Sequence, residues 1–69
     1  MATVNPSDLR LASREKPSTG EGGVSNWGWV DSIPWGSCIA RYHAQENFWE
    51  DRESGRRLNV EKWASQWTD

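Results

Sequence analysis

Residues 47–60 read NFWEDRESGRRLNV, and their charges restrict how this part of the chain can fold. A four-residue loop at 52–55 places one apolar pair and two pairs of opposite charge across two strands: Trp49 with Leu58, Glu50 with Arg57, and Asp51 with Arg56. A three-residue loop would instead place Arg52 opposite Arg56. Complementary pairs stabilise an antiparallel sheet, and Gly55 supplies the left-handed conformation that such loops use. The stretch therefore predicts a hairpin with the four-residue loop.

Two segments before this hairpin also have the composition of strands. Residues 24–30 (VSNWGWV) and 37–44 (SCIARYHA) are separated by the turn-forming residues 31–36, DSIPWG. Side chains alternate along a strand, so two faces are expected: Cys38, Ala40, Tyr42 and Ala44 on one, and Ile39, Arg41 and His43 on the other.

A helix over 38–54 is the alternative, because this segment holds good helix formers, and it would make the fold mostly α. On that helix Glu46 and Glu53 would fall inside the apolar arc. The adjacent Phe48 and Trp49 also suit a strand with both faces covered. The sheet is the favoured prediction, and the helix stays open as an alternative.

The last residues, 58–69 (LNVEKWASQWTD), carry the spacing of an amphipathic helix. Val60, Trp63, Ala64 and Trp67 follow the pattern i, i+3, i+4, i+7. Asn59 is a suitable N-cap for such a helix. These residues predict a C-terminal helix that docks its tryptophan face on the sheet.

Residues 1–23 differ in composition from the remainder. They contain no aromatic residue, include Pro6 and Pro17, and end in PSTGEGG, so they predict a disordered tail. Residues 24–69 hold all the aromatic residues and are the predicted domain. The expected fold class is therefore α+β, with a small antiparallel sheet of three to four short strands packed against the C-terminal helix.

Size and charge narrow the function further. A chain of 69 residues with 35% hydrophobic residues can bury only a small core, and its one cysteine cannot form an internal disulfide. The net charge of -2 argues against nucleic-acid binding. The sequence has no apolar run long enough to span a membrane and no signal-peptide pattern, so a cytoplasmic location and no membrane partner are expected.

Candidate catalytic residues are few. Cys38 and His43, with Asp31 as an orienting group, are the residue types of a thiol enzyme, but on a strand they would point to opposite faces. The acidic residues of the hairpin region have arginine partners or are solvated, and no glycine-rich phosphate loop or cluster of metal ligands occurs. No enzyme activity, metal or cofactor is predicted.

The six tryptophans carry the main functional hypothesis. The predicted core consists of seven residues: Ile39, Tyr42, Trp49, Leu58, Val60, Trp63 and Trp67. Trp27, Trp29 and Trp35 are surplus to it, and they either cover the core or form a contact patch for a partner. The favoured function is a non-enzymatic protein-binding module, such as an inhibitor, adaptor or accessory subunit, with self-association as a further option; small viral or mobile-element regulators offer an analogy.

Two other functions are retained. A carbohydrate-binding module would use Trp27 and Trp29 as sugar platforms, about 7 Å apart along a strand. A minimal enzyme built on Cys38 and His43 ranks last.

Overall fold

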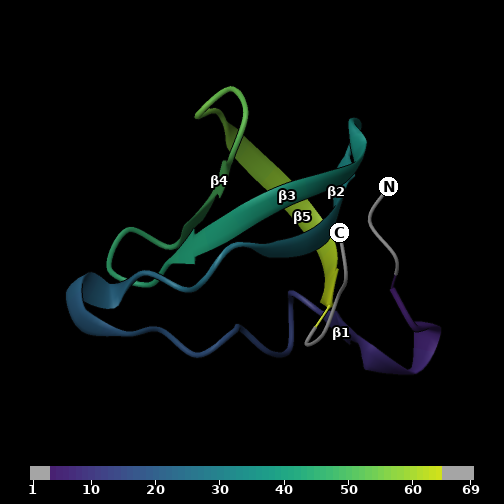
Figure 1. Cartoon of the computed structure of the whole chain (residues 1–69), viewed down its shortest axis with the longest axis horizontal. Helices are drawn as coiled ribbons and strands as arrows, with labels where there is room; N and C mark the ends of the chain where they lie inside the picture. The colour runs from purple at the N-terminus through teal and green to yellow at the C-terminus, as the bar shows by residue number, and fades with distance from the viewer. Residues whose placement is uncertain (1–3, 65–69) are drawn as a thin grey trace.

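Five antiparallel strands and two short 3-10 helices make up the described chain, residues 4–64 of a computed structural model (Figure 1). The elements follow in the order η1 (Pro6–Asp8), β1 (Leu9–Leu11), η2 (Glu21–Gly23), β2 (Gly28–Ile33), β3 (Gly36–His43), β4 (Phe48–Asp51) and β5 (Arg57–Ala64). Of the residues that the structure describes, 52% are in β-structure and 10% are in helical segments. Neither helical segment in residues 4–64 has the length and apolar character needed to cross a membrane.

Strands β2 to β5 form a closed four-stranded barrel. Each strand pairs with the next, and β5 returns to pair with β2. One edge of β5 carries β2, while the other is shared by β4 near Leu58 and by β1 near Trp63. β5 therefore holds three other strands in place, and closure leaves β2, β3 and β4 without a long open edge.

The barrel interior is filled by alternate residues of each strand, as the period of two requires. The buried cluster contains Ala12, Val30, Ala40, Tyr42, Trp49, Leu58 and Trp63, with Cys38 and Val60 packed against it. The rings of Tyr42 and Trp49 are 5.2 Å apart, and those of Trp49 and Trp63 are 6.5 Å apart. These are distances at which tilted aromatic pairs attract, so the aromatic rings replace the missing aliphatic volume.

The hairpin predicted for residues 47–60 is confirmed in its register. Trp49 lies opposite Leu58, and Glu50 lies opposite Arg57. The amide of Asp51 donates to the carbonyl oxygen of Arg56 at 2.9 Å, which closes the four-residue loop. Gly55 has a φ of 72°, the left-handed conformation predicted for it.

The predicted fold class is wrong, for both the α+β prediction and its mostly α alternative. Asn59–Ala64, the described part of the predicted C-terminal helix, belongs to strand β5, and residues 65–69 lie outside the described chain. A bulge explains the misleading spacing. Asp31 pairs with Lys62 but Ser32 pairs with Val60, so Glu61 is an extra residue that shifts the alternation.

The disorder predicted for the N-terminal segment is corrected as well. Leu9–Leu11 form strand β1 on β5, and Ala12 is only 4% exposed. The indole N–H of Trp63 donates to the carbonyl oxygen of Glu15 at 2.9 Å. The N-terminal segment pairs its backbone with β5 and covers part of a core whose other residues come from the barrel strands. The composition of the segment alone cannot show that these strands are available to it. The boundary between residues 23 and 24 as a domain limit stays a prediction.

Candidate functional site

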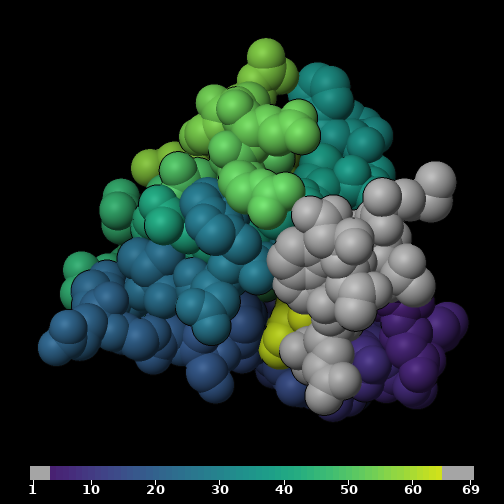
Figure 2. All heavy atoms as spheres, viewed as in Figure 1, coloured from purple at the N-terminus to yellow at the C-terminus, as the bar shows by residue number. Residues whose placement is uncertain are grey.

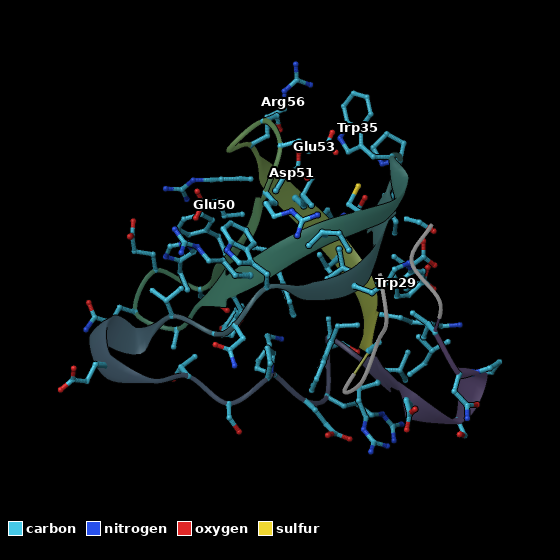
Figure 3. The ribbon with its side chains drawn as sticks, viewed as in Figure 1. Trp29, Trp35, Glu50, Asp51, Glu53 and Arg56 are labelled. Atoms are coloured by element: carbon cyan, nitrogen blue, oxygen red, sulfur yellow. The ribbon has the colours of Figure 1, made fainter. Side chains whose placement is uncertain are left out.

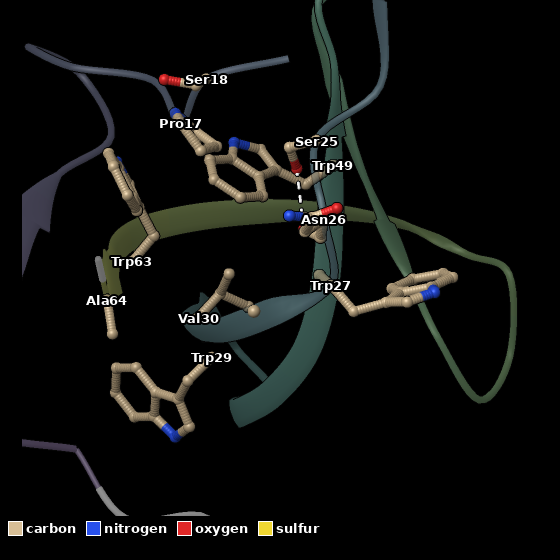
Figure 4. Close-up of a pocket in the computed structure, with 12 residues that line it drawn as sticks. Pro17, Ser18, Ser25, Asn26, Trp27, Trp29, Val30, Trp49, Trp63 and Ala64 are labelled. Atoms are coloured by element: carbon tan, nitrogen blue, oxygen red, sulfur yellow. Dashed lines mark hydrogen bonds between the residues drawn. The ribbon is translucent and has the colours of Figure 1, made fainter. Parts of the chain in front are cut away.

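The three tryptophans predicted as one contact patch lie in three different settings. Trp27 precedes β2, and the guanidinium of Arg41 lies 4.4 Å from the centre of its ring. Trp29 is half-buried on β2, opposite Ile39. Trp27 and Trp29 point to different sides in Figure 4, whereas Trp35 lies beyond the far end of β2 in the turn before β3. They do not form one patch.

Trp29 helps to line a hollow of about 110 Å³ that reaches the buried rings of Trp49 and Trp63 (Figure 4). The lining also includes Ala64, the last described residue. This volume is well below the roughly 300 Å³ of a typical ligand pocket. The hollow beside Trp29 is therefore too small for a typical ligand.

The predicted core residues occupy several environments. Tyr42, Trp49, Leu58 and Trp63 are buried, and Val60 is half-buried against the same cluster. Ile39 instead alternates with the buried Ala40 and faces the outside of β3, beside Trp29. Trp67 lies outside the described residues.

The outer face of the barrel carries a row of aromatic and charged side chains in contact with one another, which we call the outer ladder: Trp27, Arg41, Glu50, His43, Phe48 and Arg57. A single oxygen of Glu50, Oε1, lies 2.9 Å from Arg41 Nε and 2.7 Å from His43 Nε2. His43 stacks on Phe48 at 4.4 Å, and the guanidinium of Arg57 lies 4.2 Å from the Phe48 ring centre.

These contacts hold the outer ladder together and occupy its ring faces. The hydrogen bond from His43, followed by that from Arg41, lowers the pKa of Glu50 below its usual 4.5. Nucleic-acid platforms need exposed ring faces beside unpaired cations. On the outer ladder Arg41 lies over the Trp27 ring, and both His43 and Arg57 lie against the Phe48 ring.

The β2–β3 turn leaves large apolar side chains in solvent. We call Ile33, Pro34 and Trp35 the tip; Ile33 is 51% exposed and Trp35 is 59% exposed. Ile33 is the last residue of β2, and Pro34 and Trp35 form the turn that follows it; the guanidinium of Arg56 lies 5.5 Å from the Trp35 ring centre. Figure 2 shows the turn and the β4–β5 loop side by side at one end of the molecule.

A hollow of about 210 Å³ lies between these two loops, and we refer to it as the end hollow. Its lining consists of Trp35, Cys38, Asp51, Ser54, Arg56 and Leu58. Cys38 and Leu58 belong to the barrel interior, so the end hollow opens onto the top of the core. Asp51 and Arg56, labelled with Trp35 in Figure 3, lie at the same end of the molecule.

The loop beside the end hollow is held by its own hydrogen bonds. Asp51 Oδ2 accepts from Ser54 Oγ at 2.6 Å and from the Ser54 amide at 3.0 Å. The Ser54 hydroxyl is the main reason that the pKa of Asp51 lies below its usual 3.8. A loop fixed in this way presents its remaining side chains in a defined arrangement, which lowers the entropic cost of binding.

Two charged groups of that loop form no salt bridge. Within residues 4–64, neither the Arg56 guanidinium nor the Glu53 carboxylate takes part in an ion pair or a side-chain hydrogen bond. The Arg56 guanidinium does lie against the Trp35 ring, and its charge helps to lower the pKa of Asp51. Both residues are exposed, and Figure 3 labels them beside Trp35. An indole, an end hollow and two charges of opposite sign without a salt bridge in the described residues therefore share one end of the barrel.

The thiol dyad considered as the last-ranked alternative is not assembled. Cys38 faces the interior, with its sulfur 3.5 Å from Ser32 Oγ. His43 lies on the outer face against Glu50, and Asp31 pairs across the sheet with Ser37 and Lys62. In the described part of the chain, no group of His, Cys, Asp and Glu residues could hold a metal ion.

Comparison with protein-family models, curated proteins and solved structures found no match to the chain. The site therefore has to be judged from its own residues. Sequence reasoning identified Trp35 but missed Ile33, Glu53 and Arg56 as neighbours. The signal for Ile33 was its place beside Pro34 in a short turn, where loops expose side chains.

Proposed function

We propose that the chain is a non-enzymatic protein-binding module that makes contact through the tip and the end hollow. The observation that carries this proposal is Trp35, 59% exposed beside a hollow that opens onto the core. Tryptophan and arginine are enriched among residues that dominate binding energy at protein interfaces, and Trp35 lies against Arg56 here. Trp27 and Trp29, predicted to share this role, are left out of this contact surface, because Trp27 belongs to the outer ladder and Trp29 lines the smaller hollow on β2.

Carbohydrate binding has weaker support. A sugar would stack on Trp35 and bond to neighbouring polar groups. However, Arg56 lies over the ring, and the hydrogen bonds from Ser54 already engage Oδ2 of Asp51. A protein surface can instead use the arginine and the indole together. We also propose a cytoplasmic location, since Cys38 is a free thiol and reducing compartments keep thiols in that form.

The test compares capture of partner protein by the wild-type chain and by Trp35→Ser. Leu11→Ser is the matched control, because Leu11 is 42% exposed on β1, away from the tip. We expect Trp35→Ser to weaken partner binding by at least about tenfold and Leu11→Ser to leave it unchanged. Near-UV circular dichroism checks that both variants fold. Equal capture by the Trp35→Ser variant would rule out this contact surface.

A further inference from the structure

We propose that the partner of this surface is a second copy of the same chain. In the resulting two-fold dimer, the tip of each copy fills the end hollow of the other. This inference rests on the proposed function and adds the identity of the partner. It is carried by three features of one end of the barrel: a protruding apolar tip, a hollow beside it, and two charges of opposite sign that form no salt bridge within residues 4–64.

The first feature is apolar self-complementarity. The end hollow, about 210 Å³, is too small for most small-molecule ligands but suits a single side chain. The Ile33 side chain is 51% exposed, so its burial in such a hollow would be favourable. In a two-fold interface the same patch serves on both subunits, so a tip beside its own hollow can be used twice. Ile33 of one copy then covers Leu58 and Cys38 of the other.

The second feature is charge. Arg56 and Glu53 lie on the same loop, and neither forms a salt bridge within residues 4–64, although Arg56 lies against the Trp35 ring. A partner surface of uniform charge would leave one of them facing a like charge, which costs binding energy. A second copy related by two-fold symmetry supplies an Arg56 for each Glu53. The two reciprocal ion pairs would border the apolar contact.

The size of the patch sets the strength of the dimer. Stable interfaces bury about 1,200–2,000 Å² in total, and the tip offers two large side chains per copy. The interface therefore belongs to the weak class. We expect a dissociation constant of roughly tens to hundreds of micromolar.

Sedimentation velocity of the full chain, from about 10 µM to about 1 mM, measures this association. We expect the sedimentation coefficient to rise from that of a monomer toward that of a dimer, and Trp35→Ser to weaken association at least about tenfold. Cys38, the only cysteine of the chain, provides a second readout. Because it lines the end hollow, its alkylation by iodoacetamide should slow as the dimer forms.

A charge exchange tests the geometry. Glu53→Arg alone and Arg56→Glu alone should each weaken self-association, because both reciprocal pairs become like-charged. An equimolar mixture of the two variants should recover it, since each pair is then again of opposite sign. Glu21→Arg and Arg14→Glu are the matched controls, because both residues are exposed on the N-terminal segment; alone or mixed, they should behave like the wild type.

The outcomes separate the two proposals. A chain that stays monomeric up to about 1 mM, or a mixture that recovers nothing, overturns the dimer. If a different protein is then captured through Trp35, the proposed function stands with another partner. If Trp35→Ser changes neither self-association nor capture, both proposals fail.

Discussion

Glu50 links two strands of the outer face through one carboxylate oxygen. It accepts from Arg41 and from His43, both on β3, and it lies opposite Arg57 on β5. The two β3 contacts lower its pKa in the folded state below the ordinary 4.5. A lowered pKa means that the ionised carboxylate stabilises the fold, fully above pH 4.5 and progressively less as the pH falls through the lowered value.

Glu50→Gln should therefore reduce stability at neutral pH, and the difference from the wild type should shrink as the pH falls below 4.5. Urea denaturation followed between neutral pH and about pH 3 measures this difference. Glu46→Gln is the control, since its pair with Arg57 is exposed at 3.7 Å. A Glu50→Gln difference that stays constant with pH would contradict the assigned role.

Trp35 and Trp49 should differ in their response to iodide. Trp35 is 59% exposed, whereas Trp49 is 6% exposed in the core. At low concentration, Trp35→Phe should remove emission that iodide quenches, and Trp49→Phe should remove emission that iodide does not reach. Stern–Volmer plots of the two variants and the wild type provide the measurement. If Trp35→Phe left the quenchable fraction unchanged, the tip would have to be covered.

At the residue scale, the sequence predicted which side chains share a face of a strand better than it predicted which side chains are buried. The faces of β3 follow the expected order, with Ala40 and Tyr42 inside and Ile39 outside. Ile39 was nevertheless expected in the core, because hydrophobic character alone does not say which face is covered. Trp35 and Trp29 are likewise indistinguishable by residue type. Trp35 is exposed because it lies in a turn at the end of the closed barrel, whereas Trp29 is half-buried because it lies on strand β2.

The β4–β5 hairpin is the element that local chemistry determines most fully. Its register follows from cross-strand charges, and its loop depends on Gly55 at a φ of 72°. Gly55→Ala should lower the free energy of unfolding by about 1–2 kcal/mol, because an added Cβ is disfavoured in the left-handed region. No atom lies within 4 Å of that Cβ position, so the cost would come from the backbone alone.

Gly20→Ala is the matched control, since Gly20 also has open space around it but a φ of -93°. It should be neutral or slightly stabilising. Thermal or urea denaturation of both variants gives the comparison. Equal effects of the two substitutions would mean that the loop conformation of Gly55 is not required.

The part of strand β5 after Leu58 and strand β1 were not predicted, for different reasons. In β5, a bulge at Glu61 puts Val60 and Trp63 on the same side, and this spacing of three residues imitates a helix. In β1, the pairing energy depends on an edge of β5 that lies about fifty residues further along the chain. Single-segment patterns contain no information on either.

The contribution of the N-terminal segment can be measured at Ala12, which is 4% exposed. Ala12→Asp would bury an unpaired carboxylate, and we expect it to reduce stability by at least about 2 kcal/mol. Ser13→Asp, on the exposed neighbour, should change it by less than about 0.5 kcal/mol. Denaturation curves that coincide for the two variants would mean that Ala12 is not packed in the core, as the predicted disordered tail requires.

The whole molecule has one core, shared by all four barrel strands and by Ala12. A core of this kind predicts a single cooperative transition. Near-UV dichroism, which reports the aromatic rings, and far-UV dichroism, which reports the strands, should give the same urea midpoint. Separate midpoints would show that the hairpins unfold independently of the aromatic cluster.

Closure through β5 has a consequence for synthesis on the ribosome. Strands β2, β3 and β4 leave the exit tunnel before β5, and the outer strands β2 and β4 then both lack the partner that closes the barrel, Arg57–Ala64. Until that strand emerges, Tyr42 and Trp49 lack their core contacts with β5. The nascent chain then exposes an aromatic surface of the kind that chaperones bind. Closure of the barrel is therefore expected to wait until Arg57–Ala64 has emerged.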